Sequence, residues 1–462
     1  MTVRVCLNMI VKNESRIMSR CLGALMGLVD YICVCDTGST DDTVEIIHAF
    51  CKEKIENGQL TGYRVFHHPW KNFGVNRTWA VHECQRWLME SYAGTIPGNE
   101  DNKNPDEHPD PQDQEGPEGF MIGEADDESS PPGEFQVPRI LSKSALHVLE
   151  ETVILFLDAD MRFWVHPGMT ETAFRALKDT EKQSIHDRCL HDSNLMTLWK
   201  NSLKNYPLTL VYQYGNHIIY PNIRFIRGDT WIMCHGPTHE FYAGTDITTG
   251  MGIEKKVIIH DCSIEDVGDG GAKSDKFTRD IRLLQDALRE DPKNTRYWFY
   301  LANSYKNSGA IEDAIKAYKK RIDLKGWVEE IFMSHLYMGE CYELLEDRAS
   351  AMLTYLQGYH ALPVRSETLY RACVLSRKMG LYHVSQMMAL QGKKIPIPSY
   401  PALFLETQVY TYLFDEEISI YSYYIHDYET GRKACEKIIN DPHIDPDRKE
   451  LAKSNLRFYV QS

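Results

Sequence analysis

The sequence predicts two folds in succession: an α/β domain whose mostly parallel sheet lies between helices, and then an all-α solenoid of repeated helix pairs. Two observations predict this order. In the first half of the chain, apolar runs of strand length alternate with segments of helical periodicity, as in a parallel sheet covered by helices. After Lys276 the apolar residues recur with the period of about 3.6 residues that is typical of α-helices, and this period continues to the end of the chain.

The elements of the α/β part follow one another closely. Apolar runs predict strands over residues 3–11, 30–35, 63–67 and 152–157, with further strand-like runs over residues 209–226. The spacing of apolar residues predicts helices over residues 15–28, 43–54, 77–92 and, near the next strand, 140–150. We therefore expect the α/β domain to span residues 1–267.

An acidic segment interrupts this alternation at residues 99–138. It contains 13 Asp and Glu, one Lys and seven Pro, so it carries −12 of the net charge of −15. Because it has few large apolar residues, it cannot bury enough surface to offset its ordering entropy, and we predict a solvated, disordered insertion. The other 422 residues carry only −3. This near-neutral remainder argues against nucleic-acid binding through a general basic field.

Targeting signals are not apparent in the sequence. It contains no run of 18 or more apolar residues, so we predict no membrane span. The first residues lack the charged and then apolar layout of a signal peptide. We expect a cytoplasmic protein whose 12 cysteines, which form no CxxC pair, stay reduced.

The helical part, expected over residues 276–462, contains a repeat. The offsets of a tetratricopeptide (TPR) unit are matched by Trp298, Leu301, Ala302, Tyr305, Ala314 and Tyr318. The pattern returns 37 residues later and again after a further 33 residues. Stacked helices of this kind bind many ligands, so the repeat leaves the partner open: the acceptor of a reaction, another protein, or a second copy of the chain.

The sharpest chemical feature is a strand that ends in two carboxylates, Asp158 and Asp160. The residues before them, 153–157, are all apolar. Ligands of open α/β sheets bind beyond the carboxyl ends of the strands. Two carboxylates at that position suit Mg²⁺ or Mn²⁺, which prefer oxygen ligands. The alternative is a polar turn that binds nothing.

Two more strands end in polar turns at the same expected edge. Asp36 begins a turn, residues 36–42, that could present backbone N–H groups and a carboxylate to a nucleotide. The same turn could simply cap the following helix. Asn13 and Glu14 follow the first strand, and the same two interpretations apply to them. Three such strand ends in one sheet favour a binding site.

Together these motifs resemble glycosyltransferase family 2, which has the GT-A fold. The resemblance rests on residues 7–14 (LNMIVKNE), 34–43 (VCDTGSTDDT) and 156–160 (FLDAD), with residues 72–77 (NFGVNR) resembling a helix-opening segment between them. Residues 236–241 (GPTHEF) and 268–277 (GDGGAKSDKF) resemble a subfamily that carries a C-terminal TPR array. The family transfers a sugar from a nucleotide donor to an acceptor hydroxyl, usually with inversion.

The resemblance implies roles for the strand-end residues. Asp36 would contact the base or ribose of the nucleotide, Asp158 would lie near the ribose or the metal, and Asp160 would bind Mn²⁺ or Mg²⁺ directly. The residues that would help to hold the nucleotide are Asn13, Glu14, Asn76 and Arg77. A UDP-sugar is the expected donor, and the acceptor would be a hydroxyl of a glycan, a protein or a small molecule.

Inverting transfer needs a general base that takes the proton of the acceptor hydroxyl. Glu240 is the candidate base, and His239 would orient it or contact the acceptor. Without the resemblance, a surface His-Glu pair is the preferred interpretation. His260 ends an apolar run and could complete the metal site as a third ligand, or be a strand-end histidine bonded to a loop.

The Gly-rich residues 268–275 are expected to form either a lid over the diphosphate or a linker between the domains. In the first case Lys273 and Lys276 would contact the diphosphate. The sequence therefore predicts a metal-dependent, nucleotide-sugar-using glycosyltransferase with a TPR-like domain. The alternatives are a non-catalytic TPR scaffold with a degenerate sugar-nucleotide domain, and a nucleotidyltransferase, for which a Gly/Lys phosphate-binding signature near the first strand is missing.

Overall fold

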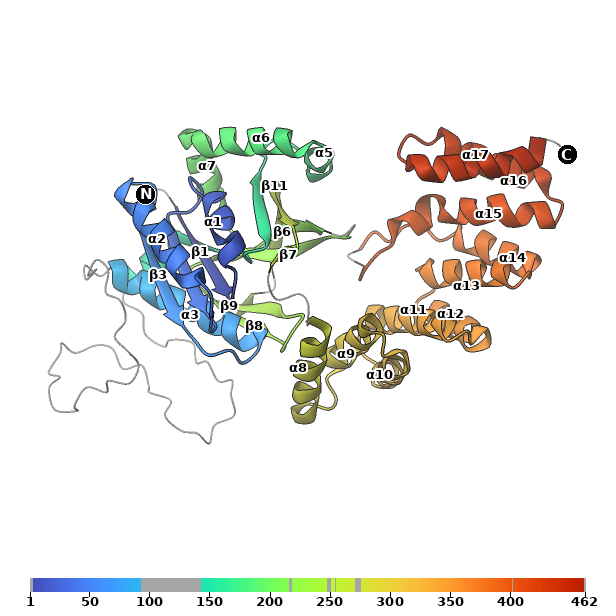
Figure 1. Cartoon of the computed structure of the whole chain (residues 1–462), viewed down its shortest axis with the longest axis horizontal. Coiled ribbons are helices and arrows are strands. Elements are labelled where there is room, and N and C mark those ends of the chain that lie inside the picture. Colours follow the sequence, from blue (N-terminus) through green and yellow to red (C-terminus); the bar gives the residue numbers. More distant parts are fainter. Residues whose placement is uncertain are drawn as a thin grey trace. The chain divides into compact units, whose positions relative to one another are not determined.

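The computed structural model describes residues 3–92, 143–215, 218–246, 251–253, 255–270, 276–400 and 402–460. The chain divides into two compact units, Met1–Ser274 and Asp275–Ser462 (Figure 1). The acidic insertion predicted at residues 99–138 lies outside the described residues, as does the start of the helix predicted at residue 140.

The first unit is built on a large mixed sheet. Its eleven described strands are Arg4–Val11 (β1), Tyr31–Asp36 (β2), Gly62–His67 (β3), Thr152–Phe156 (β4), Met161–Val165 (β5), Leu208–Gly215 (β6), Ile218–Arg227 (β7), Thr230–His235 (β8), Phe241–Asp246 (β9), Gly252–Ile253 (β10) and Lys256–Asp266 (β11). Eight of them form one sheet in the order β3-β2-β1-β4-β7-β6-β11-β5, and β10-β9-β8 form a second sheet. Strands β3, β2, β1 and β4 run parallel, whereas β7 and β5 are antiparallel to their neighbours.

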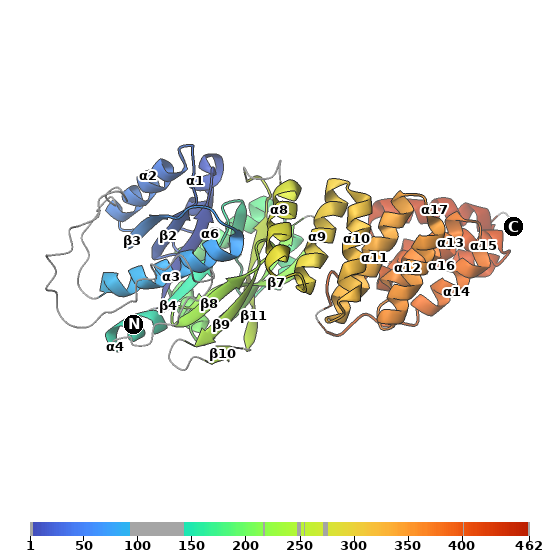
Figure 2. The same ribbon diagram turned by 90° about the horizontal axis from the view of Figure 1, so that it is seen from below.

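Helices cover both faces of the large sheet. Those of the first unit are Ser15–Gly23 (α1), Thr43–Glu56 (α2), Phe73–Tyr92 (α3), Lys143–Glu150 (α4), Glu171–Arg175 (α5), Asp179–His191 (α6) and Ser193–Leu203 (α7). Figure 2 shows α1 and α2 on one side of β2 and β3, and α3 on the other side.

Alternate residues of the central strand β1 supply two cores. Val5 and Leu7 are fully buried in the core that α1, α2 and α7 cover. Cys6, between them, is buried in the core that α3 and the strand β8 cover. This alternation is expected of a strand whose two faces are both covered. The α/β fold with a mostly parallel sheet between helices is thus confirmed.

The first unit also differs from the sequence-based prediction. The sequence pattern does not predict β5, the helices α5–α7 or the second sheet. The helix predicted over residues 15–28 ends at Gly23, and the chain turns at Gly27 with a positive φ of 89°. Leu25 and Leu28 are nevertheless fully buried, which explains why the apolar spacing continues beyond the last helical turn.

The second unit is an all-α, TPR-like solenoid. Its described α-helices are Lys276–Glu290 (α8), Thr295–Ser308 (α9), Ile311–Asp323 (α10), Val328–Leu344 (α11), Arg348–Ala361 (α12), Glu367–Lys378 (α13), Tyr382–Gly392 (α14), Phe414–Tyr424 (α15), Tyr428–Asn440 (α16) and Pro446–Val460 (α17). Consecutive helices pack on one another. A Cβ added at Gly339 would lie only 2.2 Å from the ring of Tyr355, so this small residue lets an aromatic ring fill the helix contact. The predicted TPR-like fold is confirmed.

A buried ion cluster joins distant parts of the solenoid. Arg365 is fully buried and donates hydrogen bonds to Glu367 (2.6 Å), to Glu329 on α11, and to the carbonyl oxygen of Leu403 (2.8 Å). The hydroxyl of Tyr400 in turn donates to Glu329 (2.8 Å). The cluster therefore ties the segment around residue 403 to α11 and to the start of α13.

Two general properties bear on the sequence-based expectations. None of the described helices combines the length and the apolar character that a membrane span requires. The 12 cysteines are free thiols, and all except Cys189 are buried. Burial raises the pKa of Cys6, whose sulfur lies 3.4 Å from that of Cys84, so this neighbouring pair is held as thiols.

We predict that the solenoid loses stability on mild acidification because of His335. This side chain on α11 is 7% exposed, and burial lowers its pKa to about 4. The unfolded chain takes up a proton below about pH 6.5, whereas the folded chain stays neutral until about pH 4. The free energy of unfolding should therefore fall by up to about 1.4 kcal/mol per pH unit across this range.

Urea unfolding followed by circular dichroism between pH 7 and pH 4 measures this slope. His335→Gln should flatten it, whereas replacement of the exposed His360 should leave it as in the wild type. An unchanged slope in His335→Gln would assign the acid sensitivity to other groups.

Candidate active site

The carboxyl ends of four parallel strands meet at one edge of the large sheet. In register, Val11 of β1 pairs with Asp36 of β2, and Asp36 pairs with His67 of β3. On the other side of β1, Asn8 pairs with Phe156 of β4. Asp158 follows two residues after Phe156, so it emerges at the same edge as Asp36. The topology thus brings together the strand ends that the sequence singled out.

Asp36 is 4% exposed and organises the turn that follows β2. Its carboxylate accepts hydrogen bonds from the backbone N–H groups of Gly38 (3.1 Å) and Ser39 (3.1 Å), and His67 Nδ1 lies 3.4 Å away. Gly38 has a φ of +101°, a conformation that glycine adopts without strain. Asp36 therefore shapes this turn and stands at the sheet edge as predicted.

Asn13 and Glu14 connect the ends of β1 and β2. Asn13 adopts a φ of +57°, its backbone N–H donates to Ser39 Oγ (3.0 Å), and its side-chain Oδ1 accepts from Thr40 N–H (2.7 Å). The backbone N–H of Glu14 donates to Thr43 Oγ1 (2.8 Å) at the start of α2. These contacts hold the two turns together, so that any ligand at this edge meets one rigid surface.

Arg77 on α3 bridges two of the predicted site carboxylates. Its Nη2 donates to Asp158 Oδ1 and its Nε donates to Glu240 Oε1, each at 2.7 Å. Burial alone would raise the pKa of Asp158, but the guanidinium groups of Arg77 and Arg224 outweigh burial and lower it. Burial would likewise lower the pKa of Arg77, and the surrounding acidic groups, led by Asp158, raise it well above its ordinary value. Asp158 and Arg77 are therefore both charged at neutral pH.

Glu240 reaches this position because α3 begins against the turn between β8 and β9. The backbone N–H of Gly74 donates to the carbonyl oxygen of Gly236 (3.1 Å), and that of Phe73 donates to the carbonyl oxygen of Pro237 (3.1 Å). A Cβ at Gly74 would lie 2.5 Å from the Gly236 oxygen, so only glycine allows this approach. His239, next to Glu240, has a φ of +52°.

Asn76 has a different environment from Arg77. It is fully buried, its Oδ1 accepts from the N–H of Lys71 (2.9 Å), and its Nδ2 contacts His68 Nδ1 (3.0 Å) and the oxygen of Pro69 (3.1 Å). The side chain thus fixes the segment between β3 and α3. A direct contact of Asn76 with a nucleotide stays a prediction.

Asp160 lies under the segment that follows β11. The backbone N–H of Val267 donates to the Asp160 carbonyl oxygen (3.0 Å). A Cβ added at Gly270 would lie 3.3 Å from Asp160 Oδ2 and 3.3 Å from Glu14 Oε1, so both carboxylates flank this glycine. Asp269 pairs with Arg20 of α1, with 2.9 Å between Asp269 Oδ1 and Arg20 Nη2. This ion pair holds residues 267–270 against Asp160.

The two lysines that were predicted to contact the diphosphate, Lys273 and Lys276, are not among the residues at this sheet edge that the structure describes. Lys273 lies outside the described residues. Lys276 is the exposed first residue of α8, in the second unit. Contacts of either lysine with a diphosphate stay predictions.

His260 does not lie with the other predicted metal ligands. The N–H of His166 contacts the oxygen of Asp261 (2.8 Å) beyond one end of β5, whereas Asp160 directly precedes the other end. Five strand residues span about 17 Å, which is too far for one ion to bind both side chains. His260 is exposed, and its ring lies 5.7 Å from that of Tyr212. The pairing of β11 with β6 shifts register between Ile259 and Ser263, so His260 lies in an irregular part of the strand.

Three further residues of the site were beyond the reach of the sequence motifs. Arg224 on β7 is 4% exposed, donates to the oxygen of Phe156 (3.4 Å), and acts on the pKa of Asp158. Tyr242 on β9 stacks on Phe156 with 5.0 Å between ring centroids. Tyr220 on β7 is 43% exposed, and its pKa is raised, first by burial and then, against the effect of Arg224, by nearby acidic groups that include Asp158 and Glu240. A charged residue between two apolar strand residues, Ile223 and Phe225, was the available signal for Arg224.

The fold and the candidate site define a class: an α/β domain with charged side chains at the carboxyl ends of parallel strands, the edge where open α/β sheets bind ligands. Within it, the family model described as Glycosyl transferase family 2 matches residues 6–86. The match runs from β1 into α3 and includes Asp36 and Arg77. It confirms the resemblance for this part of the chain. No curated protein matches the chain in a sequence search.

Solved structures similar to part of the chain include MamA and TPR proteins. A crystal structure of MamA is 16% identical, with 40% of this chain and 87% of that chain covered and a TM-score of 0.25. A tetratricopeptide repeat protein from Parabacteroides merdae is 15% identical, with 40% and 67% covered and a TM-score of 0.32. A thermophilic TPR protein from Thermus thermophilus is 12% identical, with 39% and 91% covered and a TM-score of 0.30.

Proposed function

We propose that the chain is a metal-dependent glycosyltransferase that moves a sugar from a nucleotide-sugar donor, a UDP-sugar in the first instance, to an acceptor hydroxyl with inversion. One observation carries the proposal: Asp158 and Glu240 come from distant segments and meet on Arg77 at the strand edge where Asp36 also lies. The family match over residues 6–86 supports the same reaction class. The TPR-like unit would bind a protein partner, the acceptor or a second copy.

The residues present fit a hard divalent cation. Asp160 Oδ2 and Glu14 Oε1 both lie 3.3 Å from the point that a Cβ of Gly270 would occupy, so two carboxylates, the ligands that such ions prefer, face the same glycine. The described residues contain no cluster of three His, Cys, Asp or Glu side chains around a single point, so the donor phosphates and water would complete the coordination. Mn²⁺ or Mg²⁺ bound by Asp160 would supply Lewis-acid stabilisation of the diphosphate leaving group.

The protein side chains then account for the transfer itself. Glu240 would take the proton of the acceptor hydroxyl while that oxygen bonds to the anomeric carbon and the bond from this carbon to the diphosphate breaks. Arg77 Nε binds Glu240 Oε1, which leaves Oε2 for the acceptor. His239 would contact the acceptor beside it. Asp36 would contact the base or ribose, and Asp158 would remain fixed by Arg77 near the ribose.

We expect Asp160→Ala to abolish Mn²⁺-dependent donor hydrolysis and transfer. The loss should exceed about 100-fold, because the leaving group then lacks its bound cation. Turnover of UDP-glucose, UDP-galactose and UDP-N-acetylglucosamine with and without Mn²⁺ measures the effect, and circular dichroism shows that the variant is folded. Asp187→Ala, on the exposed surface of α6, is the matched control. Equal activity of wild type and Asp160→Ala would contradict the metal role.

The second candidate is a TPR interaction scaffold whose sugar-nucleotide domain does not catalyse transfer. The observation in its favour is that Asp158 and Glu240 are already ion-paired with Arg77 within the protein. A thermal-shift screen of UDP-, GDP- and TDP-sugars with Mn²⁺ separates the two functions, since a bound donor raises the melting temperature. Stabilisation by none of these donors would favour the scaffold.

A further inference from the structure

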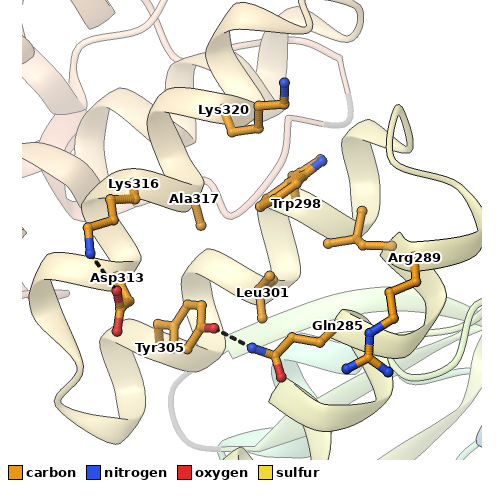
Figure 3. Close-up of a pocket in the computed structure, with 10 residues that line it drawn as sticks. Gln285, Arg289, Trp298, Leu301, Tyr305, Asp313, Lys316, Ala317 and Lys320 are labelled. Carbon is orange, nitrogen blue, oxygen red and sulfur yellow. Dashed lines mark hydrogen bonds and ion pairs between the residues drawn. The ribbon is translucent and has the colours of Figure 1, made fainter.

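The second unit has a surface hollow between α8 and α10, both of which pack on α9. Its volume of ≈ 550 Å³ lies within the range of about 300–1,000 Å³ that is usual for ligand pockets. Figure 3 shows Trp298, Leu301 and Tyr305 along α9 between the side chains of the two flanking helices. Leu288 of α8 and Ala317 of α10 complete the apolar floor. We call this hollow the α8–α10 groove.

Cationic side chains surround the apolar floor of the α8–α10 groove. Arg289 on α8 and Lys316 and Lys320 on α10 line it, against a single lining carboxylate, Asp313. Figure 3 shows the three cations on different sides of Trp298. In a chain of net charge −15, this is a local excess of positive charge. A partner with acids on both sides of an apolar centre is complementary to this arrangement, whereas a ligand with one acidic group would use only one cation.

The TPR repeat does not require the two lysines of the groove. Its pattern returns 37 residues later, and this interval places Leu353 and Gln357 at the positions that Lys316 and Lys320 hold in the first repeat. Both are uncharged, and the helices α11 and α12 of that repeat pack on one another all the same. The packing of the helices therefore does not account for the lysines, whereas an acidic partner at the surface would.

The floor of the groove is only partly covered by the protein itself. Trp298 is half-buried, whereas His335, at the matching position of the next repeat, is 7% exposed. The indole Nε1 of Trp298 donates to the oxygen of Pro292 (2.9 Å), and Gln285 Nε2 donates to the hydroxyl of Tyr305 (2.8 Å). These hydrogen bonds hold the two rings in place, so an apolar side chain of a partner would meet a preformed surface.

The cations of the groove are available to a partner. Lys316 is 73% exposed and pairs with Asp313 on its own helix (2.9 Å), and Arg289 is 77% exposed and pairs with Asp286 (2.6 Å). Exposed pairs three residues apart on one helix contribute little stability, so their cations exchange partners readily. Lys320 is exposed as well.

We propose that the α8–α10 groove binds an acidic segment of a partner protein in which a large apolar side chain lies between Asp or Glu residues. The apolar side chain would contact Trp298 and Leu301, and the flanking carboxylates would pair with Arg289, Lys316 and Lys320. Apolar contact would supply the affinity and charge the specificity. This inference gives the protein partner of the proposed function one chemistry. It does not depend on sugar transfer, because every residue that lines the groove belongs to the second unit.

Binding of a defined peptide to the full-length protein tests the proposal. The probe is the fluorescein-labelled peptide EEDLFDEE, titrated by fluorescence anisotropy at low ionic strength without donor or metal. We expect Lys316→Glu with Lys320→Glu to raise the Kd of the probe about tenfold or more, because the groove then repels its acids. The matched control, Lys433→Glu with Lys453→Glu, makes the same change of net charge at exposed lysines of α16 and α17 and should leave the Kd unchanged. An unbound probe, or one Kd for both double variants, would overturn the proposal.

Two altered peptides test the two parts of the recognition. EEDAADEE lacks the apolar centre, and KKRLFRKK reverses the charges, so each should bind about tenfold more weakly or worse. Binding of either with the affinity of the probe would contradict the stated chemistry. With benzoylphenylalanine in place of the phenylalanine of the probe, we expect photo-adducts within residues 285–320, mapped by mass spectrometry. Adducts confined to other helices would overturn the location.

A second copy of the chain is the other possible occupant of the groove. Sedimentation velocity of the full-length wild type and of Lys316→Glu with Lys320→Glu distinguishes it from a partner protein. We expect both proteins to sediment alike at every concentration. Self-association of the wild type that the two charge reversals abolish would assign the groove to a second copy and overturn the proposal.

Discussion

Replacing Glu240 by Gln should reduce the rate of sugar transfer by about 10²- to 10⁴-fold, which is the usual contribution of a general base. Gln keeps the shape of the side chain and an Oε1 that still accepts the 2.7 Å hydrogen bond from Arg77 Nε. The nucleotide site around Asp158 should therefore stay intact. We expect kcat to fall while the Kd for UDP with Mn²⁺, measured by calorimetry, changes by less than about threefold.

The comparison of kcat with Kd separates two roles of Glu240. A parallel loss of transfer and UDP affinity would show that Glu240 supports the nucleotide site through Arg77. Glu53→Gln, at an exposed position of α2, is the matched control and should change neither quantity. A Glu240→Gln enzyme with wild-type kcat would remove Glu240 from the mechanism.

Replacing Arg365 by Met should lower the free energy of unfolding by about 3–5 kcal/mol, since removal of one partner leaves buried carboxylates without compensation. Glu367 is fully buried, and Glu329 is 4% exposed. The substitution also removes the hydrogen bond from Arg365 to the carbonyl oxygen of Leu403. Equilibrium unfolding in guanidinium chloride, monitored by the helical circular dichroism signal, measures the change.

An exposed ion pair provides the control for this prediction. Arg432 pairs with Glu436 on α16, and both side chains are 42% exposed. Arg432→Met should change the free energy of unfolding by less than about 0.5 kcal/mol, because exposed pairs contribute little. If Arg365→Met were as mild as Arg432→Met, the buried cluster would not be needed for the stability of the solenoid.

The sequence predicts the parts of the fold that local pattern determines. The strands β1, β2 and β4 are mainly apolar, and the repeat positions of Gly339 and Tyr355 follow from the TPR spacing. The second sheet is harder to foresee, because β10 is two residues long and β8 and β9 are recognisable only by their pairing. The early end of the helix α1 is also hard to predict, because the buried residues Leu25 and Leu28 of the following turn continue the spacing of apolar residues that is typical of a helix.

The candidate site likewise contains residues that the sequence predicts and residues that only the fold brings together. Asp36 and Asp158 are predictable because each lies at or just beyond the end of a strand at a common edge. The bridge formed by Arg77 could not be predicted, because its partners Asp158 and Glu240 lie 81 and 163 residues away in the sequence. His260 looks like a strand-end ligand, yet it lies within β11, beside the irregularity in its pairing with β6. Arg224 belongs to none of the sequence motifs, and the pairing of β7 with β4 brings it near Asp158.

The strand order of the first unit has a consequence for how the protein folds. Strand β1 pairs with β4, whose first residue is Thr152, and β5 pairs with β11, which ends at Asp266. These pairings close large loops, which slows folding, whereas the solenoid is built from contacts between consecutive helices. During synthesis the first unit cannot complete its sheet until β11 has left the ribosome. We expect the helical unit to fold faster, although it is made last, and refolding of the whole chain to be limited by the sheet.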